Sequence, residues 1–205
     1  MGLPLPAQAA YDAAFMAAQN TPAPVKLREK AQLMTASETE AALARIAAAI
    51  VSRNGGVNGL GFMGIRRRGV PMAERLSKFI KSMHGATIPI GSLGISFYRD
   101  DLSTVGPKPV VQESQIEFPL EASKIILVDD VLFTGRTTLA ALEALISQNR
   151  PIQLQLCVLI DRGHRELPIA ADFVGRTVAT TMNEVIEVKF METDGMEKVL
   201  LMEKT

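Results

Sequence analysis

Residues 125–138 read Ile-Ile-Leu-Val-Asp-Asp-Val-Leu-Phe-Thr-Gly-Arg-Thr-Thr, and this stretch decides the fold. Four apolar residues are followed at once by two carboxylates, Asp129 and Asp130, and then by a short polar turn. An apolar run of this kind is typical of a buried parallel strand. After the turn, apolar residues recur at helical spacing: Leu139, Leu142, Leu145 and Ile146. The sequence therefore predicts a strand, a tight loop and a helix in succession.

The chemistry of this loop points to a phosphorylated sugar. A loop that leads into a helix N-terminus offers backbone N–H groups to an anion. The two carboxylates would repel a phosphate, so Asp129 and Asp130 are expected to face sugar hydroxyls or a metal. The simpler interpretation is a strand end with solvated acids and a capped helix. The acids, the turn and both flanking elements occur together in register, which favours a binding site. The expected phosphate cradle consists of Thr134, Gly135, Arg136, Thr137 and Thr138.

The rest of the chain alternates strand and helix patterns, which predicts an α/β fold with a mostly parallel sheet. Ser37 and Glu40 form a candidate capping box. The helix after it would bury Leu43, Ile46, Ala47, Ile50 and Val51. A second helix starts at residues 69–71 and would bury Ala73, Leu76, Phe79 and Ile80. Strands are expected at 59–65, 87–98, 124–128 and 154–160, a loop at 99–115, and a terminal hairpin from 185–190 and 198–203.

Ligands of such sheets bind beyond the carboxyl ends of the strands. The loops that follow Ile65, Tyr98, Val128 and Ile160 are therefore expected to meet at one site. The single cysteine, Cys157, lies inside an apolar run, which predicts a buried strand residue rather than a catalytic thiol.

Composition limits the class of protein. The chain has 205 residues, of which 47% are hydrophobic, and Lys+Arg and Asp+Glu balance at 22 each. Residues 1–30 form an Ala/Pro-rich extension without a basic start, which argues against a secretory signal, although Met16 or Met34 could be the true start. Residues 31–205 form the expected domain. One cysteine is compatible with the reducing cytoplasm, and no apolar run approaches the ~18–20 residues of a membrane span.

The stretch at 125–138 resembles the phosphoribosyl-pyrophosphate (PRPP) signature of type I phosphoribosyltransferases. Three further stretches, 64–69 (Gly-Ile-Arg-Arg-Arg-Gly), 96–102 (Ser-Phe-Tyr-Arg-Asp-Asp-Leu) and 159–168 (Leu-Ile-Asp-Arg-Gly-His-Arg-Glu-Leu-Pro), resemble the PyrR family. Members of that family are uracil phosphoribosyltransferases, and many also bind RNA and attenuate pyrimidine biosynthesis operons. The resemblance runs from about residue 30 to the C-terminus, and its most specific part is 161–168.

The resemblance implies a type I phosphoribosyltransferase fold, with helices on both sides of the sheet and a small C-terminal hood hairpin. The implied reaction makes UMP and pyrophosphate from uracil and PRPP. Mg²⁺ would be carried by PRPP, with no protein ligand assigned directly. UMP or UTP and pyrimidine operon leader mRNA are implied partners, and a homodimer or homotetramer is implied.

The resemblance also assigns site residues. Asp129, Asp130 and Arg99 are expected to be catalytic, and Arg99 opens a mobile loop with Asp100 and Asp101. Apart from the family, residues 98–101 could be a polar strand end and 66–68 a solvated basic turn. No general base is assigned to Asp161 or His164. Contacts to PRPP or UMP are expected from Asp129, Asp130, Val131, Leu132, Phe133, Thr134, Gly135, Arg136, Thr137, Arg66, Arg67, Arg162 and Ile186.

The chain departs from the family at several positions. Arg67 stands where many relatives have Thr, and Gly94 where they commonly have Asp. Ala44, Ala48 and Ala170 replace polar residues of RNA-binding members. The expected RNA contacts that remain are Arg45, Arg53, Arg165 and Arg176.

Because the net charge is zero, RNA binding must rest on a local patch. Three interpretations stay open: an active uracil enzyme that also regulates, a regulator with vestigial catalysis, and a phosphoribosyltransferase for another base, such as orotate or a purine. The stretch at 161–168 argues against the last.

Overall fold

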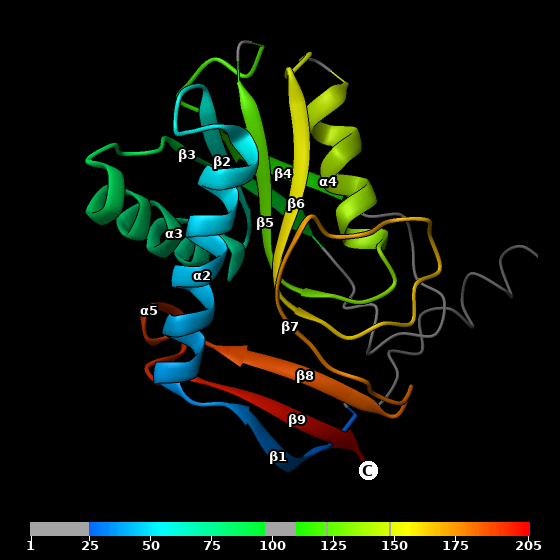
Figure 1. The fold of residues 1–205 in the computed structure, drawn as a ribbon. Coiled ribbons are helices and arrows are strands. Elements are labelled where there is room, and N and C mark those ends of the chain that lie inside the picture. The colour runs from blue at the N-terminus through cyan, green and yellow to red at the C-terminus, as the bar shows by residue number, and fades with distance from the viewer. Residues whose placement is uncertain (1–24, 97–109, 122, 148) are drawn as a thin grey trace, which may run out of the picture.

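The computed structural model describes residues 25–96, 110–121, 123–147 and 149–205 (Figure 1). Its main sheet has six strands in the order β4-β3-β2-β5-β6-β7, and every neighbouring pair is parallel except β3 with β4. The predicted α/β class with a mostly parallel sheet is confirmed. The strands are β2 (Leu60–Ile65), β3 (Ile90–Ser96), β4 (Val110–Gln115), β5 (Lys124–Leu132), β6 (Gln153–Asp161) and β7 (Phe173–Thr177).

Strand β5 lies at the centre of this sheet, as its apolar sequence predicted. Ile125 to Val128 are completely buried, because helices cover both faces of the sheet. Val128 pairs with Gly64 of β2 on one side and with Cys157 of β6 on the other. Cys157 is buried as predicted, and this burial raises the pKa of its thiol.

Helices α2 (Ala36–Asn54) and α3 (Gly69–His84) cover one face of the sheet, and α4 (Arg136–Ile146) covers the other (Figure 1). The predicted inward residues of α2 are all buried. The predicted capping box was wrong by two residues. Thr35 is the N-cap and pairs with Glu38, because the backbone of Thr35 is extended whereas Ser37 already lies inside the helix. None of the described helices is long and apolar enough to cross a membrane.

The helix predicted after the turn is confirmed as α4, but not all of its apolar residues face the sheet. Leu139 and Ile146 are 39% and 56% exposed. The helix instead turns Ala140 and Ala141 toward the sheet, together with Leu145. Small side chains allow the helix axis to approach the strands closely, and the longer residues at the edge remain in solvent.

A second sheet forms the hood below the main sheet (Figure 1). Its three strands have the order β1-β9-β8, and both pairs are antiparallel. The predicted hairpin is confirmed as β8 (Glu184–Lys189) and β9 (Lys198–Lys204), which are joined through the short helix α5 (Met191–Asp194). Strand β1 (Leu27–Met34) completes the sheet, so the domain boundary expected after residue 30 falls inside a strand. The extension up to residue 24 lies outside the described residues.

Besides β1, two further strands were absent from the predictions. Val110–Gln115, expected within a loop, forms edge strand β4 against β3. Strand β7 was missed because it is short and contains Gly175. A Cβ at Gly175 would lie 2.5 Å from the Leu159 carbonyl oxygen, so glycine is required for β7 to pair closely with β6. Residues 97–109, which include Arg99, Asp100 and Asp101, lie outside the described residues.

Candidate active site

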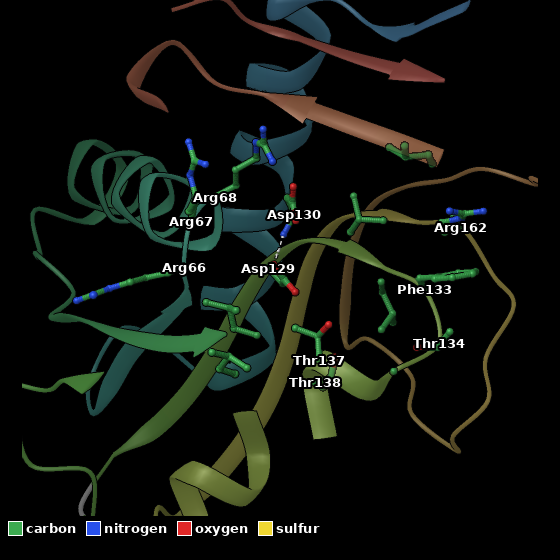
Figure 2. Close-up of a pocket in the computed structure, with 16 residues that line it drawn as sticks. Arg66, Arg67, Arg68, Asp129, Asp130, Phe133, Thr134, Thr137, Thr138 and Arg162 are labelled. Atoms are coloured by element: carbon green, nitrogen blue, oxygen red, sulfur yellow. Dashed lines mark hydrogen bonds between the residues drawn. The ribbon is translucent and has the colours of Figure 1, made fainter. Parts of the chain in front are cut away.

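A cavity of about 410 Å³ opens at the carboxyl ends of β2, β3 and β5 (Figure 2). Its volume falls in the range typical of small-molecule sites. The loops after β2, β5 and β6 meet there, as predicted. Expected site residues that line it are Asp129, Asp130, Val131, Leu132, Phe133, Thr134, Gly135, Thr137, Thr138, Arg66, Arg67, Arg162 and Ile186. Ile65, Arg68 and Ile95 also line it and were not assigned from the sequence.

The two acids occupy the middle of this cavity (Figure 2). They lie within β5, which continues to Leu132, rather than beyond the end of the strand. Asp129 is only 9% exposed, and its Oδ1 accepts a hydrogen bond of 2.9 Å from the backbone N–H of Asp130. Burial, and then the negative charge of Asp130, raise the pKa of Asp129 well above its usual value. The cavity therefore holds a carboxyl group that resists ionisation until something compensates its charge.

The loop on one side of the acids ends at the N-terminus of α4. Gly135 is the N-cap of the helix and has a φ of 93°, a left-handed conformation that glycine adopts without strain. The side chains of Thr134 and Thr138 are buried beside it, and the hydroxyl of Thr134 accepts a hydrogen bond from the Arg136 N–H. Backbone N–H groups at a helix start bind anions. Arg136 is not among the residues that line the cavity, and its guanidinium pairs with Glu166 at the surface, so the contact expected from Arg136 is left to its backbone N–H.

The segment after β6 fixes this loop in place. The N–H groups of Arg162 and Glu166 donate to the carbonyl oxygens of Leu132 (3.1 Å) and Thr134 (3.0 Å). The guanidinium of Arg165 donates to the carbonyl of Phe133 at 2.6 Å and forms an ion pair with Asp161. The family-specific run at 161–168 therefore supports the backbone of the loop. Arg165, for which an RNA contact was expected, makes these internal contacts.

Arg162 lines the cavity but directs its donors into the protein. It is 2% exposed, and its guanidinium donates to the carbonyls of Thr181 (3.0 Å) and Glu184 (2.6 Å). The same guanidinium lies 4.1 Å from the centroid of the Phe133 ring. Arg162 therefore joins the hood to the loop after β5. Ile186 of β8, also predicted near the substrate, is buried on the same side of the cavity.

The arginine loop, residues 66–68, lies on the other side of the acids (Figure 2). A Cβ at Gly69 would lie 2.2 Å from the Val128 carbonyl oxygen, so glycine alone allows α3 to begin this close to β5. The peptide between Arg66 and Arg67 is cis. Arg66 extends away from the acids and donates to the Ser92 hydroxyl at 2.9 Å.

Arg68 is a charged residue of the cavity that was not assigned from the sequence. It is half-buried and forms two hydrogen bonds with Asp194, from Nη2 to Oδ1 at 2.8 Å and from Nε to Oδ2 at 3.2 Å. Burial lowers its pKa, but hydrogen bonding to Asp194 and attraction to Asp130 outweigh this and raise the pKa of Arg68 overall. No local signal separates Arg68 from its two arginine neighbours, because its partner is far away in the sequence.

Three of the expected RNA contacts gather on one exposed face formed by α2 and β7. Arg45 donates to the Gly175 carbonyl at 2.5 Å, Arg53 pairs with Asp172 at 2.8 Å, and Arg176 donates to the Leu33 carbonyl. We call Arg45, Arg53 and Arg176 the basic face. Arg165 lies beside the cavity and does not belong to it.

Comparison with known proteins identifies the chain's domain family and its relatives. Residues 31–193 match the family model described as "Phosphoribosyl transferase domain". The "Bifunctional protein PyrR" of Thermus aquaticus is 53% identical over 178 residues, which are 87% of this chain and 98% of the relative. The protein of the same name from Pelotomaculum thermopropionicum is 49% identical over 176 residues, 86% of this chain and 97% of the relative.

Solved structures support the fold. A hypoxanthine phosphoribosyltransferase from Trypanosoma cruzi superposes with a TM-score of 0.68 at 18% identity, covering 85% of this chain and 96% of the other. A hypoxanthine-guanine phosphoribosyltransferase from Bacillus anthracis gives 0.63 at 16% identity, covering 87% and 99%. These likenesses confirm the phosphoribosyltransferase fold, and the sequence relatives show that the chain belongs to the PyrR family.

Proposed function

We propose that this chain is a uracil phosphoribosyltransferase, which converts uracil and PRPP to UMP and pyrophosphate. The observation that carries the proposal is the order of groups in one cavity. Asp129 and Asp130 stand between the N-terminus of α4 and the arginine loop. PRPP has the same order of chemistry, with a 5-phosphate, two ribose hydroxyls and a pyrophosphate.

Each part of the cavity then has a role. The loop from Thr134 to Thr138 binds the 5-phosphate through backbone N–H groups and hydroxyls. Asp129 and Asp130 accept hydrogen bonds from the ribose hydroxyls. The arginine loop faces the pyrophosphate. Phe133 and Ile186 form the apolar wall on the hood side, against which the flat ring of uracil packs.

The reaction breaks the bond from C1 of ribose to the pyrophosphate oxygen and forms a bond from C1 to N1 of uracil, whose N1 proton passes to the departing pyrophosphate or to water. The sugar passes through a state like an oxocarbenium ion, as in glycoside hydrolysis. The charges of Asp129 and Asp130 stabilise that cation without a covalent nucleophile. The raised pKa of Asp129 means that binding must first favour its ionised form.

Mg²⁺ fits this site as a partner of the substrate. Within the described part of the chain there is no cluster of three or more His, Cys, Asp or Glu residues that could hold a metal ion. Mg²⁺ is commonly held by one or two carboxylates, water and substrate phosphates, and Asp129 and Asp130 supply such carboxylates. When bound, the ion would neutralise charge on the departing pyrophosphate.

The proposal is tested by incubating purified protein with PRPP, Mg²⁺ and one base at a time: uracil, orotate or hypoxanthine. Nucleotide product should form from uracil. The matched control is the double variant Asp129→Asn with Asp130→Asn, which should fold but lose turnover. Product from orotate or hypoxanthine alone would show a different base specificity, and full activity in the double variant would refute the assignment of the acids.

A second function, regulation of pyrimidine genes through binding of leader mRNA, is favoured by the basic face. Its three arginines are exposed although each also makes an internal contact. Ala44, Ala48 and Ala170 remove polar contacts of about 1 kcal/mol each relative to RNA-binding members. We therefore expect weak affinity that depends on salt.

Titration of a leader RNA at two salt concentrations, with and without UMP, tests this function. Changing Arg45 and Arg53 to Gln should weaken binding and reduce the salt dependence. Arg28→Gln, an exposed arginine of β1 that pairs with Glu203, is the control. Binding that is equal in all variants would exclude the basic face as the RNA site.

A further inference from the structure

Two arginines of the α3 region form ion pairs with the corner of the hood that contains α5. Arg68, at the N-cap of α3, forms the two hydrogen bonds with Asp194. Arg75, about two turns later, pairs with Glu192 at 2.7 Å and with Glu197 at 2.5 Å. The contacts are chemically alike, since both join a guanidinium of the α3 region to carboxylates of the same corner.

Only one of these arginines reaches the cavity. Arg68 lines it beside Asp130, whereas Arg75 does not line it and instead lies 4.9 Å from the centroid of Phe190. The attraction of Asp130 contributes to the raised pKa of Arg68. The Arg68 guanidinium donates two hydrogen bonds to Asp194, and Arg68 lines the cavity together with Asp130.

The carboxylate of Asp194 is held in place by several hydrogen bonds. Its Oδ2 accepts hydrogen bonds from the Thr193 hydroxyl at 2.7 Å and from the Phe190 N–H at 3.1 Å. Partial burial opposes ionisation of Asp194, but the hydrogen bonds from Arg68, Thr193 and Phe190 outweigh it and lower its pKa. The carboxylate is therefore charged and fixed in orientation, and both its oxygens bond to Arg68.

We propose that Asp194 is a positioning residue for the phosphoribosyl site. It holds the Arg68 guanidinium at the pyrophosphate end of the cavity through two hydrogen bonds. A fixed positive charge then faces the leaving group. The inference rests on the proposed function, because it assigns Arg68 to the end of the cavity where pyrophosphate would bind.

The experiment compares Asp194→Asn with Glu192→Gln in the full chain. PRPP affinity with Mg²⁺ is measured by calorimetry without any base, and the midpoint of thermal unfolding is measured in parallel. Asp194→Asn should weaken PRPP binding about tenfold, because the Arg68 guanidinium loses the charged partner that fixes its orientation. Glu192→Gln loosens the same corner and should leave PRPP binding unchanged. Equal effects on PRPP binding in the two variants would reduce Asp194 to a structural role and overturn the proposal.

A double variant shows whether Asp194 acts through Arg68. If it does, Asp194→Asn combined with Arg68→Gln should bind PRPP no worse than Arg68→Gln alone. Additive losses would contradict the proposal. Should Asp194→Asn fail to fold, Arg68→Lys keeps the charge but loses the two parallel hydrogen bonds, and undiminished binding in that variant would also overturn the inference. Wild-type protein that binds no PRPP would instead refute the proposed function itself.

Discussion

The guanidinium of Arg162 lies 4.1 Å from the centroid of the Phe133 ring, although the two residues belong to different loops. Phe133 follows β5, and Arg162 follows β6. The donors of Arg162 bind the carbonyls of Thr181 and Glu184 at the start of the hood. This one side chain therefore sets the distance between the hood and the loop that would hold the 5-phosphate.

Replacing Arg162 should destabilise the fold more than an ordinary arginine substitution. Arg162→Gln removes the donors to the carbonyls of Thr181 and Glu184, of which the Glu184 bond is buried, and removes the stack on Phe133, so the free energy of unfolding should fall by about 3 kcal/mol. Urea denaturation measures this change. Phe133→Leu removes only the stack and should cost about 1 kcal/mol. A loss below 0.5 kcal/mol, the usual size for surface substitutions, would show that Arg162 is dispensable.

Asp129→Asn should stabilise the free protein at neutral pH while it abolishes turnover. The folded-state pKa of Asp129 is raised by burial and by Asp130. Folding therefore favours the protonated form, and stability is lost as pH rises from the ordinary carboxyl pKa of about 4 through the raised value. The variant removes that loss and should melt higher than wild type at pH 8, with the gap closing toward pH 4.

Asp194→Asn is the control, because its effect on stability at pH 8 should have the opposite sign. Its pKa is lowered in the folded state, so Asp194 stabilises the protein above the ordinary carboxyl pKa and loses this effect only as pH falls through the lowered value. The variant should melt lower than wild type at pH 8. Thermal unfolding followed from pH 4 to pH 8 compares both variants, and an equal change in both would contradict the assignment for Asp129.

Gly69→Ala should strongly destabilise the protein, because there is no space for the added methyl group. Its Cβ would lie 2.2 Å from the Val128 carbonyl oxygen, and backbone atoms cannot move aside as a flexible side chain can. We expect a loss of about 3 kcal/mol in unfolding free energy or more, together with weaker PRPP binding as the arginine loop shifts.

Gly85→Ala is the matched control for that change. Gly85 is the C-cap at the other end of α3, with a φ of 71°, and nothing lies within 4 Å of its Cβ position. It should cost about 1 kcal/mol and leave PRPP binding unchanged. Similar PRPP affinities in the two glycine variants would show that the close approach at Gly69 does not position the site.

Cys157 should be unreactive toward thiol reagents in the native protein. Burial raises the pKa of its thiol, and the side chain is inaccessible, so little thiolate can form or meet a reagent. Labelling with 5,5′-dithiobis(2-nitrobenzoate) at pH 8 should be slow until denaturant is added. Rapid labelling without denaturant would indicate that β6 opens readily.

The sequence by itself determined what depends on neighbours along the chain. The apolar run before Asp129, the turn at Gly135 and the helix after it all lie between residues 125 and 146, and their order predicted both the parallel strand and the anion cradle. The inward face of α2 was also readable, because helical periodicity is local. Local patterns failed where two candidate capping boxes fitted the sequence equally well. Thr35–Glu38 and Ser37–Glu40 have the same spacing, and only the backbone conformation at Thr35 shows which pair caps the helix.

Only the tertiary structure decided which distant charges meet. Arg68 and Asp194 are 126 residues apart, so the three adjacent arginines looked equivalent until the hood folded onto α3. The same holds for β1, which acquires its role by pairing with β9 at the opposite end of the chain. The physical reason is that the packing of whole helices and strands sets which side chains form an ion pair and which strands pair in a sheet. The residues adjacent in the sequence do not indicate these partners.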